Sequence, residues 1–375
     1  MQTNMNTDIS LKRIISILVV IITLSLSSCG GAKIHSKKYI GTPSNTVWFE
    51  EDEYHSDFNS TLVKKDGKDY KILLLADIQV DKENKKGKKH AFGLIDKLVA
   101  ATNPDFIVSL GDNTQGYHSD IMAKKLSNHI AKFNIPWAVV LGNHDSEGRR
   151  GRPWFGNHYE ASKNSLFKYG PSNIHGVGNF TVQLKDENGD IIYSFVMFDS
   201  NTYREYEGGE GYDFIHRDQI NWYEWQIKGI SAAQYGEFNP EENKVVPSIC
   251  FFHIPLLEFD DAAKAVKNGD INAANVIGEN KEGVASAKLN SGLFDVMKRL
   301  KSTTHVYCGH DHINNMSVDW QGIKLSYGLK TGRTSYHDEG MQGGTLVTIK
   351  ADKSNKVKST AKVEMEHIYI INQVE

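Results

Sequence analysis

Short apolar runs alternate with segments of helical periodicity from residue 70 onward. In the expected helix at 91–101, apolar residues recur at positions 94, 95, 98 and 99, which is the spacing of one helix face. The first elements expected are, in order, a strand at 72–76, a helix at 91–101, a strand at 106–110, a helix at 121–133 and a strand at 137–141. Because strands joined by helices pair in parallel through right-handed crossovers, this region predicts a parallel sheet.

The pattern changes after a loop rich in glycine and arginine at 147–157. Two β-rich runs at 180–184 and 191–198 flank the sequence Glu-Asn-Gly-Asp at 187–190, which is typical of a hairpin turn. The remaining elements expected are a helix at 218–230, a strand at 248–252, a long polar insertion, a helix at 292–300, a strand at 305–308 and four antiparallel strands at 316–320, 323–327, 344–349 and 363–371. Two mixed sheets flanked by helices, a four-layer αββα sandwich of the α/β class, fit this order better than one doubly wound sheet.

Composition narrows the classes of protein that this chain can be. With 375 residues, 39% hydrophobic and 24% charged, it excludes disorder and a multi-pass membrane fold. A formal net charge of −3 gives no field that favours nucleic acid as a partner. The cysteines at 29, 250 and 308 cannot form a disulfide framework or a CxxC zinc site. We expect Cys250 and Cys308 to be buried thiols, with a disulfide between them as the alternative.

The first 28 residues have the composition of an export signal. Lys12 and Arg13 precede an apolar run at 14–26, which is shorter than the roughly 20 residues that a membrane-spanning helix needs. The sequence Leu-Ser-Ser-Cys at 26–29 resembles the lipobox of bacterial lipoproteins, in which the cysteine becomes the lipidated first residue. The resemblance implies lipidation at Cys29 and a protein held at a membrane outside the cytoplasm. An N-terminal anchor helix with an incidental cysteine is the alternative.

These observations predict three regions in the chain. They are a lipoprotein signal peptide at 1–28, a tether and lead-in at 29–69, and one folded domain at 70–375. Gly30, in place of an acidic residue after the cysteine, favours the periplasmic face of the outer membrane by resemblance to lipoprotein sorting rules.

Polar residues follow five of the expected strands at the point where each strand ends. The sequences are Asp77-Ile78-Gln79, Gly111-Asp112-Asn113, Gly142-Asn143-His144-Asp145, His253-Ile254-Pro255 and Gly309-His310-Asp311-His312. Open α/β sheets bind ligands outside the carboxyl ends of their strands, so these side chains are expected to converge on one cleft.

Carboxylate, amide and imidazole donors suit metals such as Zn, Mn, Fe or Mg. Two carboxylates, one amide and three imidazoles are too many donors for a single ion with an open position, and they are about right for two. Two metals roughly 3.5–4 Å apart form the clamp that phosphatases and nucleases use for in-line attack on phosphorus. They lower the pKa of the attacking water toward about 7.

In this order, the five blocks resemble the signature of the calcineurin-like metallophosphoesterases, and most of all the branch related to purple acid phosphatases. They span residues 77–312. The resemblance implies an αββα sandwich, two divalent or trivalent ions (Fe, Zn or Mn) and phosphoester hydrolysis by a metal-bound hydroxide. By position, it implies that Asp112 bridges the metals, Asp77 and His312 hold the first, Asn143, His253 and His310 hold the second, His144 protonates the leaving group, and Asp145 orients His144.

The first block departs from the family pattern. It normally ends in histidine, and here position 79 is glutamine. An amide oxygen is a weaker ligand than imidazole, so Gln79 is expected either to ligate the first metal or to hold a bound water, with an inert role as the alternative. The first metal is therefore expected to be bound more loosely or to differ in identity.

Candidates for substrate contact come from arginine-containing loops. They are Arg149, Arg150 and Arg152 in the loop after the third block, Arg333, Tyr336 and His337 in a late loop, and His216 and Arg217 before the helix at 218. Arginine binds phosphate through paired hydrogen bonds, so these residues are expected to contact substrate. The alternative is that they are solvent-exposed charges with no role in binding.

The chain is thus expected to be a membrane-anchored hydrolase of small phosphorylated substrates. A non-catalytic lipoprotein that binds phosphorylated ligands, with a weakened first metal site, is one alternative. A nuclease or nucleotide pyrophosphatase of the same superfamily is another, although the near-neutral charge argues against nucleic acid.

Overall fold

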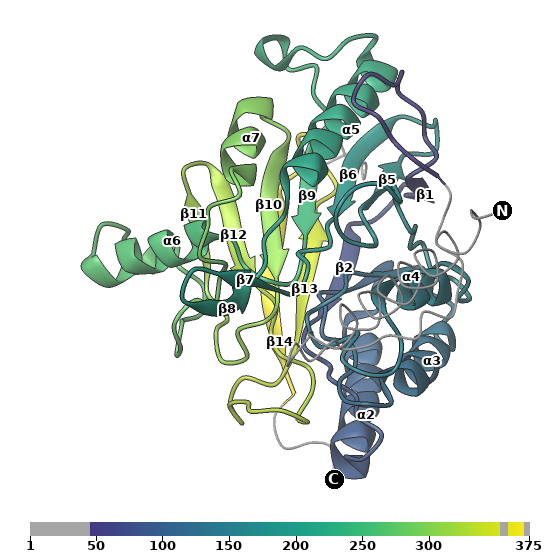
Figure 1. Cartoon of the computed structure of the whole chain (residues 1–375). Coiled ribbons are helices and arrows are strands. Elements are labelled where there is room, and N and C mark those ends of the chain that lie inside the picture. Colours follow the sequence, from purple (N-terminus) through teal and green to yellow (C-terminus); the bar gives the residue numbers. More distant parts are fainter. Residues whose placement is uncertain (1–45, 353–358, 371–375) are drawn as a thin grey trace, which may run out of the picture. The chain divides into compact units, whose positions relative to one another are not determined.

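The computed structural model describes residues 46–352 and 359–370. The expected signal peptide, tether and lipidation residue Cys29 lie outside the described residues. Two large sheets dominate the described part of the chain, with helices beside each of them (Figure 1).

The smaller of these sheets contains the expected parallel core. Its strands β2, β3 and β4 pair in parallel, while β13 pairs antiparallel with both β2 and β14. In spatial order the strands are β14 (Val363–Tyr369), β13 (Gly343–Ile349), β2 (Tyr70–Leu75), β3 (Phe106–Ser109) and β4 (Trp137–Val139). The predicted strand–helix–strand order is therefore confirmed.

The second sheet has seven strands and mixed pairing. The hairpin expected at 180–198 forms its antiparallel pair β5–β6, whereas β6, β9, β10 and β12 pair in parallel. Its order is β1 (Asn59–Val63), β5 (Phe180–Lys185), β6 (Ile191–Met197), β9 (Ser248–Phe251), β10 (Thr303–Cys308), β12 (Ile323–Tyr327) and β11 (Ser317–Trp320). Strand β1 lies within the predicted lead-in and pairs in parallel with β5 at the edge of this sheet.

The two sheets share an apolar core, which the alternation of strand residues explains. On β6, Phe195 packs between the sheets and stacks against Phe106 of β3, with ring centroids 5.9 Å apart. The neighbouring Val196 faces the other way, into a second core beneath the helices. Because both faces of the strand are buried, the sequence of β6 is apolar at nearly every position.

Helices cover the outer face of each sheet, which confirms the αββα sandwich. The five-stranded sheet carries α2 (Lys85–Thr102), α3 (Ser119–Ala131) and α4 (Arg152–Glu160). The seven-stranded sheet carries α5 (Arg217–Tyr235), α6 (Leu257–Asn268) and α7 (Leu293–Leu300). Two short 3-10 helices, η1 (Pro240–Glu242) and η2 (Ala273–Asn275), lie in loops.

Several elements differ from the sequence prediction. Helix α2 begins six residues early, because the Asn84 side chain accepts a hydrogen bond from Gly87 N at 2.8 Å and caps a lysine-rich first turn that has no apolar period. Helix α4 occupies part of the expected loop at 147–157, with Pro153 in its first turn. Helix α6 lies in the expected polar insertion.

Cys250 and Cys308 are buried free thiols, so the alternative disulfide does not form. Among the helices that the structure describes, none combines the length and apolarity required to cross a bilayer.

The contact between the sheets gives a test of the sandwich. Phe195→Ala should lower the free energy of unfolding by about 3–5 kcal/mol, because it leaves a cavity where rings from both sheets meet. Urea denaturation measures the change. Phe49→Ala is the matched control, since Phe49 is 53% exposed and its loss should change stability little. Equal stability of the two variants would contradict the packing described.

Candidate metal centre

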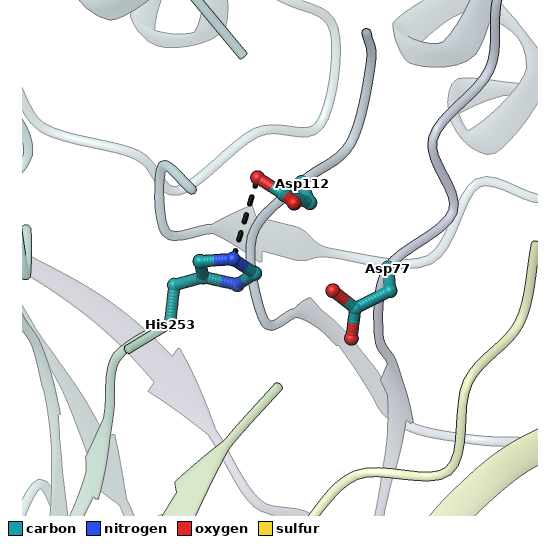
Figure 2. A group of neighbouring side chains, drawn as sticks. All are labelled: Asp77, Asp112 and His253. Atoms are coloured by element: carbon teal, nitrogen blue, oxygen red, sulfur yellow. Dashed lines mark ion pairs between the residues drawn. The ribbon is translucent and has the colours of Figure 1, made fainter. Parts of the chain in front are cut away.

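The expected convergence of strand ends is present in the structure. Asp77 follows β2 and Asp112 follows β3 in one sheet, whereas His253 follows β9 in the other. One ligand atom from each of these three buried residues lies within 4.8 Å of the others. Figure 2 shows the three side chains pointing toward one another. The centre therefore lies where the carboxyl ends of strands from both sheets meet.

The glycines of the motifs are required for this close approach. A Cβ at Gly142 would lie 2.1 Å from Asp112 Oδ1, and one at Gly111 would lie 2.5 Å from His253 Nδ1. Asp77 and Asp112 have φ values of 49° and 47°, in the left-handed region that non-glycine residues seldom adopt. Backbone conformations of this kind cluster at functional sites, where surrounding contacts hold them in place.

Asp112 is the central carboxylate of the cluster. Its Oδ1 lies 3.3 Å from His253 Nε2 and accepts a hydrogen bond from His144 N at 2.9 Å. Its Oδ2 accepts one from Gln79 Nε2 at 3.2 Å. Burial raises the pKa of Asp112, but the charge and hydrogen bond of His253 outweigh burial and lower the pKa overall. The carboxylate is thus ionised and can attract a cation.

The imidazoles of His253 and His310 are oriented as metal ligands. His253 Nδ1 donates to Leu110 O at 2.8 Å, which directs Nε2 into the centre. His310 Nδ1 lies 3.2 Å from His253 Nε2. Burial lowers the pKa of His253, but the charge of Asp112 outweighs it and raises the pKa to about 9. Burial and His253 lower the pKa of His310 to about 3. The negative charge of Asp112, which favours a proton on His253, also favours a metal cation at the same place.

Asn143 completes this side of the centre. Its Nδ2 donates to Tyr203 OH at 2.8 Å, which leaves its Oδ1 available. Within the described part of the chain, the buried atoms Asn143 Oδ1 and His310 Nε2 have no hydrogen-bond partner. His253 Nε2 lies 3.2 Å from His310 Nδ1 and 3.3 Å from Asp112 Oδ1, so a carboxylate and two imidazoles meet at this point. The residues of the expected second site therefore fit a metal ion.

The expected first site has a different environment. His312 Nε2 lies 3.5 Å from Asp77 Oδ1, and its Nδ1 donates to Tyr336 O at 2.9 Å. Burial raises the pKa of Asp77, but His312 and the other neighbouring cations lower it overall. Gln79 Oε1 accepts a hydrogen bond from the buried Lys330 Nζ at 2.7 Å, so this oxygen is already engaged. Gln79 therefore lies in the centre, as expected, but its oxygen faces a lysine.

Known proteins resemble this chain over the region that contains the five blocks. The model of the family described as "Calcineurin-like phosphoesterase" matches residues 70–314, which contain all five blocks. The chain belongs to the calcineurin-like phosphoesterase family. This family generally consists of phosphoester hydrolases with a dinuclear metal centre.

The names of two relatives of this chain differ in what they say about activity. "Probable inactive purple acid phosphatase 29" of Arabidopsis thaliana is 29% identical over 74% of this chain and 74% of its own length. "Phosphatase DCR2" of Saccharomyces cerevisiae is 31% identical over 59% of this chain and 38% of its own length. A solved dimetal phosphatase from Danio rerio is 13% identical, covers 75% of this chain and 96% of its own, and superposes with a TM-score of 0.47.

The histidine expected to act as the acid lies at the edge of the centre. His144 Nε2 is 3.8 Å from Asp112 Oδ2, and its side chain is 34% exposed. Its Nδ1 is hydrogen-bonded to Glu147 Oε1. Burial lowers the pKa of His144, but Glu147 and Asp112 outweigh burial and raise it to about 9. The imidazole therefore holds a proton at neutral pH.

The role expected for Asp145 is wrong. Its buried carboxylate accepts hydrogen bonds from Gly142 N, Asn113 Nδ2 and Thr114 N, each at 2.9 Å. It therefore joins the loops after β3 and β4 instead of orienting His144. Burial and the charge of Asp112 raise the pKa of Asp145 to about 6. The partner of His144 is Glu147, three residues along the chain, because adjacent side chains on this turn point in different directions.

The arginines expected to contact substrate all have carboxylate partners. Arg149 pairs with Asp120 through three hydrogen bonds, and Arg150 lies 3.7 Å from the same carboxylate. Arg152 binds Asp199, and Arg333 binds Glu339 and Gln342. His216 caps α5, and Tyr336 OH donates to Glu282. Substrate contact by these residues stays a prediction.

Sequence reasoning missed an aromatic hairpin beside the centre. Strands β7 (Tyr203–Tyr206) and β8 (Gly209–Tyr212) pair antiparallel. Tyr203 holds Asn143, while the Tyr212 ring lies edge-on to His310 with centroids 4.4 Å apart. The Gly208-Gly209 turn, with Tyr203 and Tyr206 before it and Tyr212 after it, was a hairpin signal that could have found this element.

The central carboxylate, Asp112, gives a test of the metal centre. Asp112→Asn should weaken retention of added zinc or manganese by at least about 10–100-fold, because it removes the buried charge shared by both sides of the site. Equilibrium dialysis with elemental analysis measures retention. Asp261→Asn, on the exposed face of α6, is the matched control. Retention by the Asp112 variant equal to that of the control would exclude the centre described.

Proposed function

We propose that this protein is a metal-dependent phosphoester hydrolase. The observation that carries the proposal is the convergence of the buried Asp77, Asp112 and His253 from three strand ends, with His310 and His312 packed against them. Ions held there, with iron, zinc or manganese as candidates, would activate water as a nucleophile and neutralise charge on the phosphate.

The residues of the chain have separable roles in this reaction. Asp77 and Asp112 provide the negative charge that binds cations, and Asn143, His253, His310 and His312 provide neutral donors. His144 is placed to donate a proton to the leaving oxygen, which is the role of a general acid. Glu147 holds the Nδ1 side of the ring and thereby directs Nε2 toward the centre.

The proposed substrate is a small phosphorylated molecule. The formal charge of −3 supports such a substrate over nucleic acid, because phosphate backbones are bound mainly by basic surfaces. Tyr203 and Tyr212, with ring centroids 5.4 Å apart, form an aromatic wall that a substrate could contact at the second site.

A non-catalytic role in binding phosphorylated ligands is the second candidate. It is favoured by the engaged oxygen of Gln79 and by relatives named "Probable inactive" purple acid phosphatases. The presence of His144 with its Glu147 partner argues for catalysis, because ligand binding alone requires no proton donor.

The acid role predicts a specific kinetic defect. His144→Ala should lower kcat about 10²–10⁴-fold with metal content unchanged, because proton donation is lost while the ligands remain. The metal-stripped protein is assayed with p-nitrophenyl phosphate and bis(p-nitrophenyl) phosphate after manganese, zinc, iron or magnesium is added back. His175→Ala, at an exposed histidine away from the strand ends, is the control. No hydrolysis by the wild type under any of these conditions would favour the binding role, and loss of metal from the His144 variant would contradict the acid assignment.

We also propose that the protein is anchored by lipid at Cys29, with the periplasmic face of the outer membrane favoured. The lipobox-like sequence at 26–29 supports this proposal. In a bacterial host, Cys29→Ser should move the protein from the membrane fraction to the soluble extracytoplasmic fraction, because the largely apolar run at 14–26 is too short to span a bilayer as a helix. Immunoblots of the fractions follow the change. A variant that stays in the membrane would instead support the alternative of an N-terminal anchor helix.

A further inference from the structure

Lys330 is fixed beside the expected first metal site by the backbone around it. Thr331 N donates to Ala76 O at 2.8 Å, and Gly332 N donates to Asp77 O at 3.2 Å. A Cβ at Gly332 would lie 2.0 Å from Ile78 O, so the two segments approach as closely as glycine allows. The Lys330 side chain is consequently held against the strand end that carries Asp77 and Gln79.

The side chain of Lys330 is buried and fully engaged with this strand end. It is 2% exposed, and its Nζ donates to Gln79 Oε1 at 2.7 Å and to Asp77 O at 3.0 Å. An ammonium group has donors and no acceptor, so the Gln79 atom that faces it must be the amide oxygen.

The other end of the Gln79 amide supports the same orientation. Its Nε2 donates to Asp112 Oδ2 at 3.2 Å. Reversing the amide would place its oxygen against a carboxylate and its nitrogen against the ammonium, which loses both hydrogen bonds. The oxygen is the atom of glutamine that binds metals, and it is turned to the lysine.

The two halves of the centre are therefore unequal. At the second site, Asn143 Oδ1 and His310 Nε2 are buried without partners. At the first site, Gln79 Oε1 accepts a hydrogen bond from Lys330. The amide nitrogen of Gln79 donates a hydrogen bond to Asp112 Oδ2. A second dication there would also lie close to a lysine, and like charges in a buried site repel strongly.

We propose that the Gln79–Lys330 pair replaces a ligand of the first metal, so that the protein retains one ion tightly, beside Asp112 and His253. The Lys330 Nζ lies against Gln79 Oε1 and the Asp77 backbone at the first site. The inference rests on the metal centre of the proposed function and concerns how many ions that centre holds.

The test is the number of ions that the full chain retains. Metal-stripped protein is equilibrated with manganese, dialysed and analysed for metal per chain. The wild type should retain about one ion, and Gln79→His with Lys330→Met should retain about two, since the double change restores an imidazole donor and removes the lysine charge. Lys64→Met is the matched control, because Lys64 is also buried, at 3% exposure, but bonds the Lys65 carbonyl oxygen; it should behave as the wild type.

The outcomes separate this inference from the proposed function. Two ions retained with similar affinity by the wild type would overturn the inference alone, as would a folded double variant that still retains one. No ion retained by any of the proteins would overturn the metal centre itself. If the double variant does not fold, anomalous diffraction from manganese-loaded wild-type crystals decides the matter: one peak beside Asp112 and His253 supports the inference, and two equal peaks refute it.

Discussion

The structure depends on keeping two carboxylates ionised and close together in a buried position. Asp77 and Asp112 are each 1% exposed, and one ligand atom from each lies within 4.8 Å of the other. Burial alone would drive both carboxylates to their neutral forms, because charge is poorly solvated away from water. They stay ionised because cationic partners surround them. These are the imidazole of His253 beside Asp112, the ammonium of Lys330 beside Asp77 and, in the function we propose, metal.

This requirement explains why the centre lies at the strand ends of two sheets. Strands of one sheet bring Asp77 and Asp112 together, but the imidazoles come from loops after β9 and β10 in the other sheet. The stacked aromatic residues between the sheets, Phe195 with Tyr70 and Phe106, therefore help to set the distance between the acidic and the basic halves of the centre. Glycines at 111 and 142 then let the loops approach without a side chain between them.

Around the centre, each ligand is oriented by a second group. Leu110 O fixes His253, Tyr336 O fixes His312, and the Tyr203 hydroxyl fixes Asn143. Such outer contacts set which atom of each ligand faces the metal. The same logic explains Gln79, whose oxygen is oriented away from the centre by Lys330. In the inference we propose, this position has changed from a metal donor to part of a hydrogen-bonded pair with Lys330.

The sequence by itself determined the sandwich, the order of its central strands and the ligand blocks, because strand period and the polar residues that end each strand are local signals. It could not determine which side chain meets which. Asp145 was expected to orient His144, yet the direction of side chains on that turn gives the role to Glu147. Tyr203 and Lys330 lie 60 and 251 residues from their partners Asn143 and Gln79, so only the folded chain shows those contacts. Contacts over such separations depend on how the loops pack, and no periodicity in the sequence encodes that packing.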